Sequence, residues 1–145
     1  MKNKNELNEE WWDKSPMTYE DWNFSENIRG LINVDKIKKI NSDYINTNHY
    51  LDYFFKNIKN DNQENTVLDI GCGWGSSTVI LSKIFKKVYS IDLSAKSVSA
   101  AKENIRLNGF PEKVNLSKYD AEKLNFTNYF DLVFSWGVIH HSNNT

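Results

Sequence analysis

Residues 66–77 read TVLDIGCGWGSS, and this stretch decides the fold. A short apolar run ends at Ile70, and glycines then follow at alternate positions: Gly71, Gly73 and Gly75. The pattern predicts a strand, a glycine turn and a helix that begins near Gly75 or Ser76. Glycine suits such a turn because it accepts a positive φ and because it lets a ligand approach the backbone closely. The free N–H groups of the helix start would favour a polar or negative group.

A glycine-rich turn after a strand is also a common tight connection, so the neighbouring sequence must decide between a turn and a site. A second apolar run, residues 88–91, ends in Asp92. This aspartate lies about 20 residues beyond the turn, the spacing at which nucleotide-binding folds place a carboxylate on ribose hydroxyls. The two signals together favour a nucleotide-type ligand.

The rest of the chain alternates between helical and strand patterns. Apolar spacing predicts two helices before the turn, and we interpret the second as a core helix rather than a substrate-binding face. We expect Ser94 to cap one helix and Asn108-Gly109 to end it in a left-handed conformation. The alternation predicts an α/β fold with a doubly wound parallel sheet and right-handed crossovers. The predicted helices are 34–44, 51–58, 76–85 and 95–108; the strands are 66–70, 88–91, 114–119 and 131–135, with a short helical or turn connection at 121–126.

Three carboxylates are expected to meet at one edge of this sheet. Asp69 lies near the end of the first strand, Asp92 at the end of the second and Asp120 just beyond the third. Ligands of parallel sheets bind outside the carboxyl ends of the strands. Aspartate is also an ordinary cap or turn residue, but the convergence of three carboxylates favours a binding site.

The ordered segments VLDIGCGWG, YSIDLS, KYDAEKLNF and FDLVFSWGVIHHS resemble the motif series of class I S-adenosylmethionine-dependent methyltransferases, over residues 66–145. The pattern differs from dinucleotide-binding oxidoreductases, because Ser76 stands where their third glycine falls. A carboxylate at Asp69 would also repel a pyrophosphate and suit the ammonium of a methionyl group. The resemblance implies a Rossmann-like fold, S-adenosyl-L-methionine as cofactor and methyl transfer as the activity.

The resemblance also implies a role for individual residues. Asp69 and the glycine loop would hold the methionyl part, Asp92 the ribose hydroxyls, and Leu93 the adenine face. Asp120 and the backbone of Ala121 would read the adenine edge. The segment that begins at Ser135 would face the methyl group, with His140 as a hypothetical general base. The implied cofactor-binding residues are Asp69, Gly71, Cys72, Gly73, Gly75, Asp92, Leu93, Asp120, Ala121 and Ser135.

Two competing site types are disfavoured by the sequence. Adjacent side chains diverge, and no other Cys or carboxylate cluster stands at ligand spacing, so His140 and His141 do not predict a metal site. Cys72 has no base close to it in the sequence, so we interpret it as a small loop residue rather than a nucleophile. The segment after the fourth strand lacks the Asn/Asp-Pro-Pro-Tyr pattern of enzymes that methylate amide or adenine nitrogens. We therefore expect a small-molecule methyl acceptor.

Length, charge and cysteine content limit the number of domains, the partners and the cellular compartment that we expect. A chain of 145 residues predicts one domain, and a net charge of -1 gives no general attraction to nucleic acid or anionic lipid. The single cysteine permits no intrachain disulfide and fits a reducing compartment. No apolar stretch resembles a signal peptide or approaches the ~18 residues of a membrane span. We expect a cytoplasmic protein without a nucleic-acid or membrane partner.

The two ends of the chain give further expectations. Residues 1–60 are expected to form an N-terminal extension and residues 61–145 a partial cofactor-binding domain. Residues 1–10 are expected to be disordered, and the aromatics of residues 11–24 form either a surface clasp or a lid over the site. The family has a seven-stranded sheet and this sequence reaches the fourth strand, so we expect a fragment. Its open sheet edge could mediate self-association, and a non-catalytic binding module is the alternative function.

Overall fold

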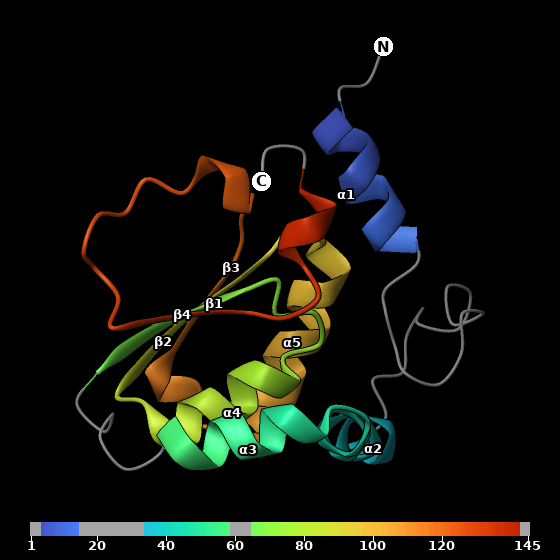
Figure 1. Cartoon of the computed structure of the whole chain (residues 1–145). Coiled ribbons are helices and arrows are strands. Elements are labelled where there is room, and N and C mark those ends of the chain that lie inside the picture. Colours follow the sequence, from blue (N-terminus) through green and yellow to red (C-terminus); the bar gives the residue numbers. More distant parts are fainter. Residues whose placement is uncertain (1–3, 15–33, 59–64, 143–145) are drawn as a thin grey trace.

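The computed structural model describes residues 4–14, 34–58 and 65–142. Its centre is a parallel sheet with the strand order β3-β2-β1-β4 (Figure 1). This order and the parallel pairing confirm the predicted α/β sheet. The strands are β1 (Thr66–Ile70), β2 (Lys87–Asp92), β3 (Val114–Lys118) and β4 (Leu132–Ser135).

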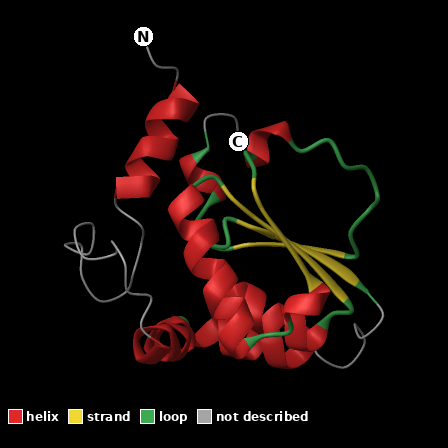
Figure 2. Cartoon of the chain, turned by 180° about the vertical axis from the view of Figure 1, so that it is seen from behind, coloured by secondary structure: helices red, strands yellow, loops and turns green. Residues whose placement is uncertain are grey.

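Helices cover one face of the sheet, and a long loop lies toward the other (Figures 1 and 2). The crossover helices α4 and α5 contact the strands that they connect, while α2 and α3 pack on α4. Short 3-10 turns follow α5, β3 and β4. The helices are α1 (Lys4–Lys14), α2 (Val34–Thr47), α3 (His49–Ile58), α4 (Ser76–Ile84) and α5 (Ala95–Asn108), and the 3-10 turns are η2 (Pro111–Lys113), η3 (Ala121–Lys123) and η4 (Ile139–His141).

Alternation along the strands separates two apolar layers. On the helical side, Val67 and Val88 are buried against Phe85, which follows α4. On the other side, Leu68 and Ile91 pack against residues that follow β3 and β4, among them Leu124, Phe130 and Val138. The chain therefore changes faces between β3 and β4, as a doubly wound sheet requires, and the switch point lies between the carboxyl ends of β1 and β4.

The helix ends follow local sequence, with one exception. The Ser94 hydroxyl accepts the Ser97 N–H at 3.1 Å, so the predicted N-cap of α5 is confirmed. The predicted left-handed stop at Asn108-Gly109 is wrong, because Gly109 has φ -114°. Its N–H donates to the Ile105 carbonyl at 2.9 Å instead, and a Cβ at Gly109 would lie 3.1 Å from the Ser82 hydroxyl. Glycine is thus used here for close packing.

The N-terminal region differs in part from expectation. The prediction of disorder is wrong for residues 4–10, which lie in α1 with Trp11 and Trp12. Residues 15–24, which hold the other aromatics of the predicted clasp or lid, lie outside the described residues. The core interpretation of α3 is confirmed, because Leu51 and Phe55 are buried in the main apolar cluster.

Strand β4 forms one edge of the described sheet. Phe134 is buried, with its ring 5.4 Å from Phe55 and 5.7 Å from Phe54, whereas Val133 is 54% exposed. Only part of the expected apolar edge is therefore open, and self-association through it stays a prediction. Within the described residues, no helix has both the length and the apolar character needed to cross a membrane.

Candidate functional site

The glycine turn connects β1 to α4, and its three glycines all have positive φ, as predicted: 71° for Gly71, 53° for Gly73 and 82° for Gly75. A Cβ at Gly71 would lie 2.3 Å from Val138, and one at Gly75 would lie 3.1 Å from the Ala101 backbone. A Cβ at Gly73 would have none of the described residues within 4 Å apart from its chain neighbours. The outer glycines therefore allow close packing, while Gly73 leaves open space above the turn that a ligand can enter.

Asp92, at the end of β2, holds this turn in place. Its Oδ2 accepts the Gly73 N–H at 2.8 Å, and its Oδ1 accepts the Ser94 N–H at 2.9 Å. Burial raises the pKa of Asp92, while these two N–H groups act in the opposite direction. The Leu93 N–H also acts on this carboxylate, and since two carboxylate oxygens have four lone pairs, at least one remains that a ligand hydroxyl could use.

Asp69 has a different environment, on the side of the sheet that faces α4. It is 1% exposed, and its Oδ2 accepts the hydroxyls of Ser77 at 2.8 Å and Thr78 at 2.6 Å. Thr78 is also hydrogen-bonded to Ser90 of β2. Burial raises the pKa of Asp69 to about 6, although the two hydroxyls favour the ionised form. The carboxylate therefore supports the first turn of α4 from beneath, directly next to the glycine turn.

The raised pKa of Asp69 gives a pH dependence with a defined sign. Between about pH 4 and 6 the folded chain binds a proton that the unfolded chain has released, so the free energy of unfolding falls as pH rises through this window. Asp69→Asn removes this titration. We expect the free energy of unfolding of the variant to equal that of wild type near pH 4 and to exceed it by up to about 3 kcal/mol at pH 7. Urea unfolding from pH 4 to 8 measures the difference.

Asp131 provides the matched control at the opposite end of the sheet. It accepts the Thr66 N–H at 2.7 Å and the Thr66 hydroxyl at 2.9 Å, and these bonds lower its pKa. The lowered pKa stabilises the wild type fully above the ordinary aspartate range and is lost below it, so Asp131→Asn should be less stable than wild type by an amount that does not change between about pH 5 and 8. A pH-independent gap between Asp69→Asn and wild type would contradict the assigned environment of Asp69.

The other predicted residues lie at the same edge. Asp120 caps η3, accepting the Glu122 N–H at 3.1 Å, and its other oxygen lies 3.5 Å from the Lys123 ammonium. The Tyr119 N–H donates to the Asp92 carbonyl at 2.9 Å, which joins the ends of β2 and β3. Leu93 and Ala121 are half-buried here. The structure thus places these residues at the carboxyl ends of β2 and β3, and their cofactor roles stay a prediction.

Cys72 lies inside the turn and is buried. Burial raises the pKa of its thiol well above the ordinary value, and the nearby carboxylates Asp69 and Asp92 act in the same direction. A thiolate nucleophile is therefore disfavoured, in agreement with the interpretation of Cys72 as a small loop residue.

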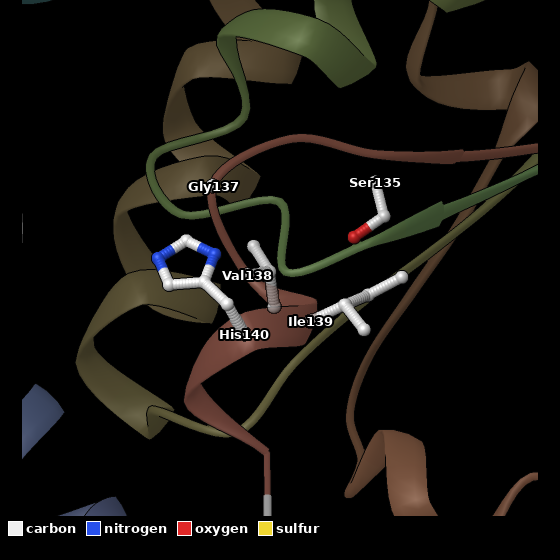
Figure 3. Close-up of a pocket in the computed structure, with 5 residues that line it drawn as sticks. All are labelled: Ser135, Gly137, Val138, Ile139 and His140. Atoms are coloured by element: carbon white, nitrogen blue, oxygen red, sulfur yellow. The ribbon is translucent and has the colours of Figure 1, made fainter. Parts of the chain in front are cut away.

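A pocket of about 430 Å³ opens beside the turn, at the carboxyl end of β4 (Figure 3). The Ser135 hydroxyl is buried and has no hydrogen-bond partner among the described residues. Such an unpaired polar group calls for a ligand or water. Within the part of the chain that the structure describes, no group of His, Cys, Asp and Glu side chains could hold a metal ion. The pocket is lined by Ser135, Gly137, Val138, Ile139 and His140.

Helix α1 lies across the carboxyl ends of the strands, next to η4 and the start of α5 (Figure 1). Its Glu9 pairs with Lys118 at the end of β3. Asp13 accepts the Ser94 hydroxyl at 2.5 Å, and the Trp12 ring lies 5.1 Å from the His141 ring. The Asn8 amide donates to the His141 carbonyl at 3.1 Å. One helix thus contacts the segments that follow β2 and β4 and the end of β3.

Several residues around the turn were missed by sequence reasoning. Asn104 of α5 is buried and bonds to the Trp74 carbonyl in the turn. The sequence did contain an indication of this role, because Asn104 is a polar residue on the face of α5 that also buries Ala100, Ala101 and Ile105. Asp13 gives no such signal, because only the tertiary placement of α1 brings it to Ser94.

Comparisons with known proteins agree with this geometry. The family described as "Methyltransferase domain" matches residues 67–145. The chain is 36% identical over 76 residues to the malonyl-[acyl-carrier protein] O-methyltransferase of Priestia megaterium, covering 51% of this chain and 26% of that protein. It is 41% identical over 59 residues to an uncharacterised RNA methyltransferase of Halalkalibacterium halodurans, covering 41% of this chain and 13% of that protein.

A solved structure resembles nearly the whole chain. The crystal structure of magnesium protoporphyrin IX methyltransferase from Synechocystis with bound S-adenosylmethionine has a TM-score of 0.65 and 19% sequence identity. The similarity covers 98% of this chain and 65% of that one, and it shows a shared fold that includes the N-terminal helices. The chain spans well under half the length of the curated relatives that it matches.

Proposed function

Because the chain belongs to the methyltransferase domain family, we propose that it binds S-adenosylmethionine over the glycine turn and serves the transfer of its methyl group to an acceptor. The observation that carries this proposal is the open space above Gly73, next to the Asp92 carboxylate that holds the Gly73 N–H. An adenosyl group needs a close approach to the backbone and an acceptor for its ribose hydroxyls. Both features occur at this one point.

The residues present fit the cofactor in three ways. Gly73 provides room, Asp92 provides a carboxylate with a lone pair to spare, and Ser135 provides a buried hydroxyl without a partner. In the proposed arrangement, Asp92 binds the ribose hydroxyls. Asp69, together with the turn, supports the methionyl part. Leu93, Asp120 and the Ala121 backbone surround the adenine, as the sequence motifs imply.

The sulfonium of the cofactor, when bound, supplies a methyl group that is already activated for transfer. The chain must then align the acceptor atom with that methyl and exclude water. The pocket at the end of β4 lies where an acceptor would enter, and His140 lines it. We assign His140 the role of accepting a proton from the acceptor, if the attacking atom carries one.

The acceptor is proposed to be a small molecule. Support comes from the missing Asn/Asp-Pro-Pro-Tyr pattern and from a net charge of -1, which gives no general attraction to a phosphate backbone. The names of the relatives point in more than one direction, since one is an uncharacterised RNA methyltransferase and another is a malonyl-[acyl-carrier protein] O-methyltransferase. An RNA acceptor is therefore the second candidate.

We further propose that residues 1–60 cap the cofactor domain formed by residues 61–145. The contacts of α1 with Ser94, Lys118 and His141 support the lid over the surface clasp, because all three residues follow or end strands at the edge where the cofactor is proposed to bind. The alternatives are a module that binds the cofactor without catalysis and, less favoured, an NAD(P)-dependent oxidoreductase.

Calorimetric titration with S-adenosylmethionine, S-adenosylhomocysteine and NAD tests the proposed function. We expect the first two to bind and NAD to give no heat. A radiolabelled methyl-transfer assay with a malonyl thioester and with RNA then separates an enzyme from a binding module and one acceptor class from the other. Binding of NAD without S-adenosylmethionine would overturn the proposal.

A further inference from the structure

A second set of side chains contacts the glycine turn next to the residue that Asp92 holds. Asn104 of α5 and Asn41 of α2 form a reciprocal amide pair. Each amide nitrogen lies 2.8 Å from the other residue's amide oxygen. The Asn104 nitrogen also donates to the Trp74 carbonyl at 2.9 Å, and the Asn41 oxygen also accepts the Ser76 hydroxyl at 2.8 Å. The pair therefore contacts the turn at both sides of Gly75.

The hydrogen bonds of Asn104 determine the orientation of its side-chain amide. A side-chain amide can donate twice and accept twice. Asn104 donates to Asn41 and Trp74, and it accepts from Asn41 and from the Asn108 amide at 3.0 Å. A reversed amide would place its oxygen against the Trp74 carbonyl. The orientation is thus determined, and Asn104 is 1% exposed, so water cannot easily replace the lost bonds.

We propose that Asn104 and Asn41 form an amide clamp that positions the glycine turn for the cofactor. Asp92 fixes the turn at the Gly73 N–H, and the clamp fixes it at the Trp74 carbonyl, so the turn is held at two successive residues. Because Asn41 belongs to α2, the clamp makes the N-terminal extension part of the cofactor site. This inference rests on the proposed function, and it assigns both residues a positioning role rather than contact with the cofactor.

The test compares Asn104→Ala and Asn41→Ala with Ser82→Ala in the whole chain. Ser82 is the matched control, because its buried hydroxyl donates to the Val79 carbonyl at 2.8 Å and accepts the Phe110 N–H at 3.2 Å, near the other end of α4. We expect Asn104→Ala to raise the dissociation constant for S-adenosylhomocysteine about tenfold, which corresponds to one buried hydrogen bond. Ser82→Ala should lower the unfolding temperature without changing the dissociation constant.

Amide hydrogen exchange at Gly75 gives a readout that does not depend on the cofactor. The Gly75 N–H donates to the Cys72 carbonyl at 2.8 Å within the turn. Its exchange should accelerate in Asn104→Ala and Asn41→Ala and stay at the wild-type rate in Ser82→Ala. An unchanged dissociation constant, or unchanged exchange at Gly75, in Asn104→Ala overturns the clamp. If the wild-type chain binds neither cofactor form, the proposed function fails, and Gly75 exchange alone decides whether the clamp holds the turn.

Discussion

Gly73→Val should abolish binding of S-adenosylmethionine while leaving the fold intact. Apart from its chain neighbours, no described residue lies within 4 Å of a Cβ at this position, so the free chain has room for the first side-chain carbon. The same space is where the cofactor is proposed to approach the backbone. At φ 53° a non-glycine residue costs roughly 1–2 kcal/mol of stability. Calorimetry should therefore show no binding, and urea unfolding should show a modest loss of stability.

Asn128→Val supplies the control for backbone strain. Asn128 also has φ 53°, is exposed, and lies in the connection between η3 and β4. This variant places valine in the same backbone conformation away from the turn. We expect a comparable loss of stability with unchanged affinity. If Gly73→Val retains wild-type affinity with its fold intact, the turn is only a tight connection.

Asp92→Ala is expected to weaken S-adenosylmethionine binding by about two to four orders of magnitude. Two ribose hydroxyls would lose a charged acceptor worth roughly 1.5–3 kcal/mol for each hydrogen bond. The Gly73 N–H would also lose its partner, which loosens the turn. Asp92→Asn keeps one acceptor oxygen and should lose less affinity than Asp92→Ala. Titration calorimetry on wild type and both variants measures the order of their affinities for S-adenosylmethionine.

Asp131→Ala is the matched control for this series. Asp131 likewise accepts a backbone N–H, that of Thr66, but at the amino end of β1. It should lose stability and keep its affinity for the cofactor. Equal affinities of wild type, Asp92→Ala and Asp92→Asn would show that the ribose assignment is wrong.

Local sequence predicted the fold well wherever local physics determines it. The strand, glycine turn and helix at residues 66–84 follow from alternation and from the need for positive φ at Gly71, Gly73 and Gly75. The cap at Ser94 likewise needs only its own neighbours. The parallel pairing of the strands followed from their alternation with helices.

What the sequence could not predict depends on contacts between distant segments. Residues 4–14 are polar and show little helical amphipathicity, and their packing on Ser94, Lys118 and His141 is visible only in three dimensions. Gly109 was predicted to be left-handed because glycine often ends helices that way. Here the closeness of Ser82 explains why a residue without a side chain occurs at this position. The environment of Asp69 was also missed, because the hydroxyls of Ser77 and Thr78 reach its carboxylate only when α4 packs on β1.

The contacts of α1 have a consequence for the rate at which the cofactor exchanges. If α1 covers the bound cofactor, release must wait until the helix detaches, so the dissociation rate reports the strength of its contacts. The ion pair between Glu9 and Lys118 lies at the surface, where salt screens it. Stopped-flow measurements should therefore show faster release at higher ionic strength and in Glu9→Gln. Rates that are insensitive to both would mean that α1 does not gate the site.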